Sequence, residues 1–482
     1  MKFANSRSER FRRLLQATHK ASQWTVWLAV LIAVQGAQAQ TAGAGQKPLR
    51  FVDLTQADVL ALPAFEIGDA DASATTPPVT GTALSEFIEK ALEISPQLQQ
   101  VRAQLATVEA GRKVARADLL PSLSLRRATG PEKSRNVGEA ADKHTYSQNA
   151  IRLTQSLINA ILFNEFQGSR QAEASAQYRL QAAYDNVVMS VLRATVDVAT
   201  ARLVLDFSSI QLAQLQNILT YLETRVSVGA ASPSDLERAR TRVLNARQTR
   251  IEQQANYRNA TLELTRLTSL TPQAIRLPDT ARFPAIPESS AQLQALAMAQ
   301  NPEILALKSD VEAQQSRIKA EMSRYMPVVG LSLERDVSKN VQGTNGPHTD
   351  TRALLVVNWA TSLGGKEWYQ AEQARAELRA REAKLTDESQ RLAQALEGDN
   401  ALMQSATLRM QTARLEQASA STVVEAVAEQ LRIGRLGSLL DALDASERYF
   451  QARQRLAQSI GQNIKAHAQI LQRTGQLREL QP

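Results

Sequence analysis

Three aspartates beside two glycine-containing turns have the spacing most suggestive of a chemical role. Asp235 stands three residues after Ser232. Asp441 follows Ser438 in the same way, and Asp444 comes three residues later. Ser-x-x-Asp suits the first turn of a helix, where the serine oxygen accepts a free backbone N–H. Capping accounts for Asp235 and Asp441, whereas Asp444 lies on the same helical face as Asp441 but beyond the cap. A carboxylate pair there could attract cations.

The remaining polar residues offer little for catalysis. Beyond residue 39 the histidines are His144, His348 and His467, and cysteine is absent. No Gly-x-Ser-x-Gly, His-Glu-x-x-His or phosphate-binding glycine loop occurs. We therefore expect no enzymatic activity, no cofactor and no metal site. Without cysteine, disulfides, thiolate metal sites and an acylated N-terminal cysteine are also excluded.

Residues 1–39 have the pattern of a cleavable secretory signal peptide. Residues 1–20 contain six basic residues and one acidic residue, and residues 25–34 form an apolar core. Ala37-Gln-Ala39 then has the small-x-small form of a cleavage site. The ten-residue core is short for a membrane anchor, which needs about 20 residues. Cleavage lowers the formal charge from +8 to +3, which removes the main argument for a nucleic-acid partner.

The rest of the chain is an internal duplication. Pro96 and Pro121 recur 206 residues later as Pro302 and Pro327, with similar apolar spacing between them. A composition of 43 % apolar and 5 % aromatic residues favours long helices over a β-sandwich. We divide the chain into an irregular N-terminal segment (40–81), a first repeat (82–270), a Pro-rich linker (271–290), a second repeat (291–472) and a tail (473–482).

Each repeat predicts one very long helix with shorter helices stacked beside it. Apolar residues recur at seven-residue intervals over about 165–228 and, more loosely, over about 366–432, which is the spacing of a coiled-coil seam. At 1.5 Å per residue, each such helix would be roughly 95 Å long. Helices beside it are expected over 96–120 and 233–269 in the first repeat and over 302–324 and 438–472 in the second.

Each repeat also predicts two strands with alternating apolar residues. They cover about 121–130 and 147–160, then about 327–336 and 351–361, with polar loops expected at 131–146 and 337–350. The mature chain has no apolar run long enough for a transmembrane helix. Four strands cannot close a barrel in lipid, so closure would need further copies of the chain. Aromatic residues near the strand ends fit an interfacial girdle or ordinary packing at a corner: Phe163, Phe166, Tyr325, Trp359 and Trp368.

In order and spacing these features resemble the TolC family of outer-membrane efflux channels over residues 82–472. The resemblance rests on the duplication, the strand starts at Pro121 and Pro327, and two turn motifs beginning at Val228-Gly229 and Ile433-Gly434. It implies a mainly α fold with a β-barrel contribution. Three chains would form a 12-stranded barrel in the outer membrane and an α-helical barrel through the periplasm. The absence of cysteine selects a non-lipidated member.

The same resemblance implies a gate and partners. Asp441 and Asp444 would form acidic rings at the closed periplasmic entrance. Asp235 and Arg435 are candidates for the links that hold it shut, although Arg435 is displaced from the family's usual position. Val228, Gly229, Ile433 and Gly434 would contact a periplasmic adaptor protein, which joins the channel to an inner-membrane ABC or RND pump.

The resemblance leaves the cargo open between small-molecule efflux and type I protein secretion. An exported coiled-coil spacer without channel activity is the alternative class. It would explain the heptads and the export but not the four amphipathic strands.

Overall fold

A computed structural model describes residues 84–134, 142–272, 275, 277–278, 283–287, 289–341, 344–432 and 439–480. The predicted signal peptide (1–39) and irregular segment (40–81) lie outside these residues, as do Ile433, Gly434 and Arg435. All described residues belong to one unit, within Thr55–Pro482.

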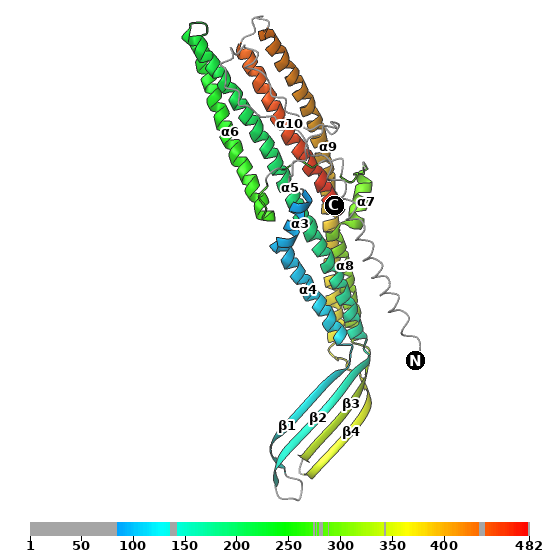
Figure 1. Cartoon of the computed structure of the whole chain (residues 1–482). Coiled ribbons are helices and arrows are strands. Elements are labelled where there is room, and N and C mark those ends of the chain that lie inside the picture. The colour runs from blue at the N-terminus through cyan, green and yellow to red at the C-terminus, as the bar shows by residue number, and fades with distance from the viewer. Residues whose placement is uncertain are drawn as a thin grey trace, which may run out of the picture. The chain divides into compact units, whose positions relative to one another are not determined.

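Both repeats follow the same order of elements (Figure 1). The first contains α3 (Leu84–Ile94), α4 (Pro96–Ala117), β1 (Ser122–Ser134), β2 (Asp142–Ile158), α5 (Ala160–Ser227) and α6 (Pro233–Thr268). The second contains α7 (Ser290–Gln300), α8 (Pro302–Ser323), β3 (Val328–Val341), β4 (Thr344–Asn358), α9 (Lys366–Arg432) and α10 (Leu439–Thr474), and a short 3₁₀ helix (Leu477–Leu480) follows. None of the helices in the described ranges has the combination of length and apolarity that crossing a membrane requires.

The two repeated prolines occupy equivalent positions in the structure. Pro96 and Pro302 are the first residues of α4 and α8, where their fixed φ and missing N–H are tolerated. The residue before each one caps the helix. The Ser95 hydroxyl accepts from the Leu98 N–H at 3.3 Å, and the Asn301 side-chain oxygen accepts from Glu303 at 2.9 Å and Ile304 at 3.1 Å. Different cap residues thus do the same task in the two repeats.

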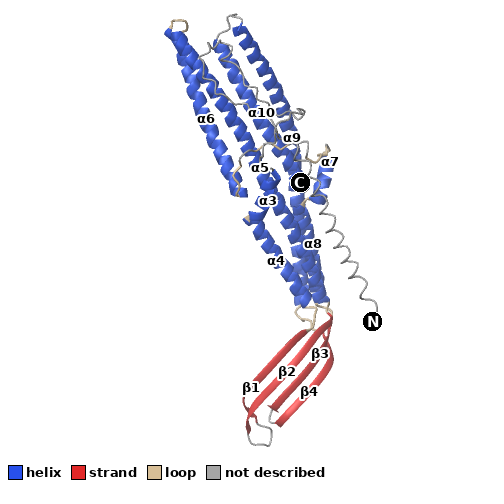
Figure 2. Ribbon diagram, in the orientation of Figure 1, coloured by secondary structure: helices blue, strands red, loops and turns tan. Residues whose placement is uncertain are grey.

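The four strands form one antiparallel sheet in the order β1-β2-β3-β4 (Figure 2). The β2–β3 pairing joins the two repeats, with Leu153 opposite Leu333. β1 and β4 are the outer strands, and no other strand in the described part of the chain pairs with their free edges. One chain therefore leaves two rows of backbone donors and acceptors unpaired.

The strands are longer than the apolar alternation predicts. They contain 13, 17, 14 and 15 residues, so most of the segments expected as loops at 131–146 and 337–350 belong to strands instead. His144 pairs with Glu132 in the ladder, and His348 pairs with Ser338. The backbone ladder continues beyond the apolar residues because its hydrogen bonds do not depend on side-chain polarity. Apolar patterning alone could not locate the far ends of these strands.

The helix α5 is the centre of the helical part. It packs against α4 and α6 of its own repeat and against α8 and α10 of the other. We expected α8 to lie beside α9, its own long helix, but α8 packs more extensively against α5. The seam residues Val191, Val198 and Leu215 are accordingly buried in α5. In α9 the seam residues Leu396 and Val424 are also buried, each 2 % exposed. Leu408 and Leu415 lie outside that seam and are 64 % and 73 % exposed.

The helix α5 contacts both α10 and the short 3₁₀ helix through buried charged groups. The Arg453 side chain is buried, with its guanidinium 4.3 Å from the Phe207 ring centroid and 5.4 Å from that of Tyr449. Asp185 is also buried and accepts from Arg478 at 3.2 Å. Burial raises the pKa of Asp185, against the opposing effect of the Arg478 guanidinium. These contacts join the two repeats through specific polar geometry as well as apolar packing.

Candidate functional site

Two exposed aspartates lie at the start of α10, and the opposite side of the helix packs against α5 and α6. Asp441 and Asp444 are both exposed, whereas Ala442 and Leu443 between them are each 1 % exposed. Those two apolar residues pack in a cluster with α5 and α6, including Ile218. This packing sets the rotation of α10, so both carboxylates face away from the core.

Asp444 is held by an arginine from the first repeat. Arg242 of α6 lies 2.5 Å from the Asp444 carboxylate and 3.4 Å from that of Glu447. The side chain of Arg242 is only 27 % exposed, so the pair is partly shielded from water. Asp441, by comparison, makes no ion pair with another described residue. Arg242 therefore ties α6 to the start of α10 and neutralises the aspartate that capping did not explain.

Sequence reasoning missed Arg242 because no local pattern distinguishes it. It is one of several arginines in α6, and Arg238 and Arg240 pair with acidic residues of their own helix. Its partner is 202 residues away. The sequence did contain an indirect signal. Asp444 has no capping role, which indicates that its charge is balanced by a cation from another element.

The first turn is built by its glycine. Gly229 has φ +72°, and nothing lies within 4 Å of where its Cβ would stand. Its N–H donates to the Val226 carbonyl at 3.0 Å, while the Ala230 N–H donates to that of Arg225 at 2.8 Å. This is the hydrogen-bond pattern of a Schellman motif ending α5. Val228 is 73 % exposed beside it, so the turn presents a rigid, partly apolar tip.

Asp235 forms its ion pair within its own helix, α6. It lies in the first turn of α6, 3.7 Å from Arg238, and the Ser232 hydroxyl accepts from the Ser234 N–H at 3.2 Å. The capping role expected for Ser232 is therefore present. Arg435, the other candidate for the lock, lies outside the described residues, so the Asp235–Arg435 link stays a prediction.

The sequence match decides the family. A model described as "Outer membrane efflux protein" matches residues 87–269 and 293–476, which are the two repeats. The chain belongs to the outer membrane efflux protein family. Members lie in the outer membrane and extend into the periplasm, and this chain shares that location.

Individual relatives agree with this assignment. The chain is 22 % identical over 397 residues to the outer membrane efflux protein BepC of Brucella suis, covering 82 % of this chain and 85 % of BepC. It is 21 % identical over 403 residues to the outer membrane protein TolC of Vibrio cholerae, covering 82 % and 91 %. The CmeC outer membrane channel of Campylobacter jejuni superposes with a TM-score of 0.69 at 14 % identity, covering 92 % of this chain and 94 % of CmeC. The mainly helical fold with a contribution from β-strands that the sequence predicts is confirmed, and the trimer stays a prediction.

In this efflux protein, the predicted aromatic girdle lies where helices meet strands. Trp359 follows β4 and donates its indole N–H to the Tyr325 carbonyl at 3.1 Å. Phe163, Tyr325, Trp359 and Trp368 are between 44 % and 67 % exposed, whereas Phe166 is half-buried. Amphipathic aromatic rings favour the membrane–water interface, so the four exposed residues suit a girdle and Phe166 suits packing.

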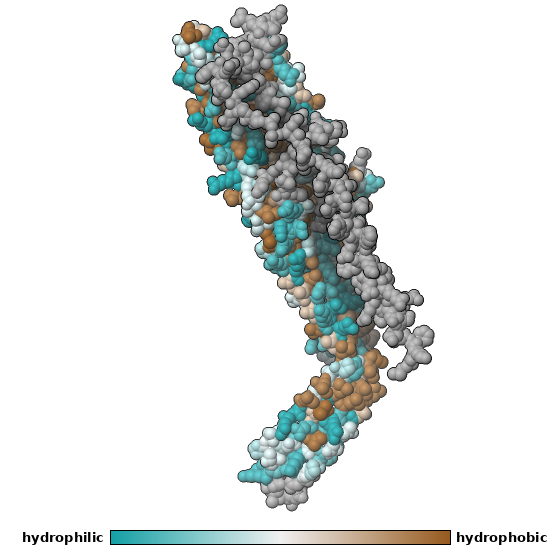
Figure 3. Space-filling model, in the orientation of Figure 1, coloured by the Kyte–Doolittle hydropathy of each residue, from teal (hydrophilic) through white to brown (hydrophobic). Residues whose placement is uncertain are grey.

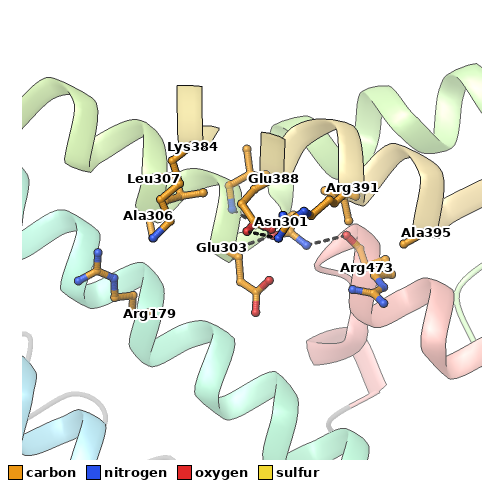
Figure 4. Close-up of a pocket in the computed structure, with 12 residues that line it drawn as sticks. Arg179, Asn301, Glu303, Ala306, Leu307, Lys384, Glu388, Arg391, Ala395 and Arg473 are labelled. Carbon is orange, nitrogen blue, oxygen red and sulfur yellow. Dashed lines mark hydrogen bonds and ion pairs between the residues drawn. The ribbon is translucent and has the colours of Figure 1, made fainter. Parts of the chain in front are cut away.

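A pocket near the start of α8 is part of a helix junction. Asn301, which caps α8, also donates its amide N–H to the Arg473 carbonyl of α10 at 3.0 Å (Figure 4). The arginines that line the pocket are paired: Arg179 with Asp310, Arg391 with Asp387 and Arg473 with Asp399. The pocket therefore belongs to a junction of helices of the second repeat with α5 of the first.

Loss of this junction should destabilise the fold. We expect Asn301→Ala to lower the free energy of unfolding by about 1–2 kcal/mol, because the cap and the link to Arg473 disappear together. Asn301→Asp keeps the cap but loses the amide donor, and Ser95→Ala removes only the equivalent cap of α4. Thermal unfolding in detergent, followed by circular dichroism, should rank Asn301→Ala as the most destabilised. An Asn301→Ala loss no larger than that of Ser95→Ala would show that the link to α10 contributes nothing.

Proposed function

We propose that this protein is the trimeric outer-membrane exit channel of a tripartite efflux system. It would pass substrates from an inner-membrane pump and periplasmic adaptor to the exterior, acting as a conduit and not as an enzyme. The observation that carries the proposal is the pair of free sheet edges, β1 and β4. Such edges in a membrane need partners, and further copies of the chain supply them.

The packing of the helices also supports closure of a ring by further copies of the chain. The α6 helix packs within the chain mainly against α5, and α9 packs mainly against α10 and α8. The outward sides of both carry apolar rows at helical spacing: Leu244, Ile251 and Leu262 on α6, and Leu408 and Leu415 on α9. An α6 flank against the α9 flank of the next copy would cover both rows, just as β1 would pair with the next β4. Such a head-to-tail contact closes into a ring when its rotation allows.

Three copies give the twelve strands that can enclose a lumen. At the other end, three α10 helices would bring their Asp441 carboxylates around one opening, with Asp444 held back by Arg242. An acidic ring of this kind attracts cations and repels anions. The turn at Val228 and Gly229 would be available to an adaptor. Efflux and type I secretion would use the same conduit.

Engineered disulfides can test ring closure, because the chain contains no cysteine. We expect a small panel of double variants, with one cysteine near Leu125 of β1 and one near Leu355 of β4, to give oxidised species of up to three chains and no more. The corresponding single variants should stay free of the three-chain species. Ladders longer than three chains would indicate an open filament, and exclusively monomeric bands in every panel member would contradict the proposed channel and favour a spacer.

A further inference from the structure

The acidic residues of the β-sheet all lie on one of its two faces. The register pairs odd with odd and even with even residue numbers across all four strands, outside irregularities near Ser156 and Lys339. One face therefore carries the odd-numbered residues and the other the even-numbered ones. Every acidic residue of the four strands has an even number.

The odd face begins with an apolar band next to the helices. Its members are exposed, and Figure 3 shows apolar residues gathered over the helix-proximal end of the sheet. They are Leu123, Leu125, Ile151, Leu153, Leu331, Leu333, Leu355 and Val357. The exposed Trp359 and Tyr325 lie at the helix-side border of this band. Such a surface suits the acyl chains of a lipid bilayer.

Beyond the apolar band, away from the helices, the odd face becomes basic. We call its five exposed cationic residues the basic rim: Arg127, Lys133, Lys143, Arg335 and Lys339. Arg335 stands opposite Ile151 in the ladder, and its long side chain can extend toward the polar zone. None of the five forms an ion pair with another described residue of the chain.

The even face, in contrast, largely neutralises its own charges. Glu334 accepts from Arg152 at 2.7 Å, and Asp350 accepts from Arg352 at 2.7 Å. Asp336 accepts from Gln148, and Glu132 lies 3.3 Å from His144. Acidic residues were thus available to the strands, but all of them stand on the face that does not carry the basic rim. The rim lacks counter-charges from its own sheet.

We propose that the basic rim binds the phosphate groups of anionic glycolipid in the outer leaflet of the membrane. The helices of this family extend into the periplasm, so the far end of the sheet faces the outer leaflet. Cationic side chains directly beyond an apolar band lie at headgroup depth, where they attract lipid phosphates. The aromatic residues at the other border then face the inner leaflet. This inference rests on the membrane location of the sheet and is independent of cargo or pump.

A binding experiment on the full purified chain in detergent micelles tests the proposal. The probe is lipid A, a bisphosphorylated glucosamine lipid, titrated and followed by native mass spectrometry. We expect the triple variant Arg127→Gln, Arg335→Gln, Lys339→Gln to bind it about tenfold more weakly or worse, since three attractive charges are removed. The charge-conserving triple variant Arg127→Lys, Arg335→Lys, Lys339→Arg should stay within about twofold of the original protein. Arg126→Gln, on the even face, should do the same.

Two further probes show whether the rim recognises the lipid through its phosphate groups. Dephosphorylated lipid A should bind the original protein and the triple Gln variant equally, and excess inorganic phosphate should fail to displace lipid A. Equal lipid A binding by both proteins would overturn the proposal, and so would efficient displacement by inorganic phosphate, which would indicate a site for free anions. If the triple Gln variant does not fold, equal affinity of the original protein for phosphorylated and dephosphorylated lipid overturns it. Trimer migration and bilayer conductance on the same samples report the proposed channel separately.

Discussion

Replacing Leu408 and Leu415 with lysine should abolish the proposed trimer of the efflux protein. Both leucines lie on the outward side of α9, seven residues apart and largely exposed in the single chain. Covering each one in an interface contributes about 1.5–3 kcal/mol per chain. Two lysines would remove that contribution and add six like charges around the ring. The unheated outer-membrane extract should therefore show monomer in place of trimer on gels.

The matched control is Leu408→Met with Leu415→Met, which keeps apolar volume and should preserve the trimer. Circular dichroism of the purified lysine variant should retain its helical signal, because neither leucine packs in the core of its own chain. A lysine variant that still migrates as a trimer would show that this flank of α9 is not an interface. The disulfide panel on β1 and β4 would then have to identify another contact.

Arg242→Gln should open the periplasmic end of the proposed channel. Its guanidinium joins α6 to Asp444 and Glu447 of α10, and it is the ion-pair link between the two turn regions that the structure describes. Two partly exposed pairs contribute about 1 kcal/mol each at most. Their loss should shift the balance between open and closed states by up to about 30-fold for each chain. Single-channel recording in planar bilayers measures this balance directly.

The control for this experiment is Arg266→Gln, which removes an equally charged side chain from the end of α6 away from the turn. Among the described residues Arg266 pairs with Glu263 of its own helix, at 2.6 Å, so its loss should leave gating unchanged. Asp444→Asn should resemble Arg242→Gln, and the double variant should add little, since both remove the same contact. Higher salt should reduce the difference between the original channel and Arg242→Gln. Identical opening in Arg242→Gln and Arg266→Gln would contradict a latch at Arg242.

Parts of this architecture followed from local sequence patterns. Pro96 and Pro302 indicated where two helices begin, because proline fits the first helical position and few others. Seven-residue spacing predicted long helices, and α5 and α9 span 68 and 67 residues. The glycine at 229 indicated a turn because φ +72° strains any other residue. These features depend on the backbone conformation of neighbouring residues, which the sequence encodes directly.

Other parts depended on which elements meet in space. The far ends of the strands were expected as loops, because their stability comes from pairing with another strand and not from apolar alternation. The packing of α8 against α5 was not predicted, since both long helices offered a seam. Asp444 was expected to face an opening. Its ion pair with Arg242 could not be predicted, because it depends on the packing of α6 beside α10.

The sequence by itself determined the duplication, the family and the approximate positions of the helices and strands. It also predicted the export signal. The tertiary structure decided the charge partner of Asp444, the free edges β1 and β4, and the separation of acidic residues from the basic rim. The physical reason is the range of the interactions. Helix caps, turns and heptads are set within a few residues, whereas an ion pair across 202 residues or the shared face of four strands exists only after the chain has folded.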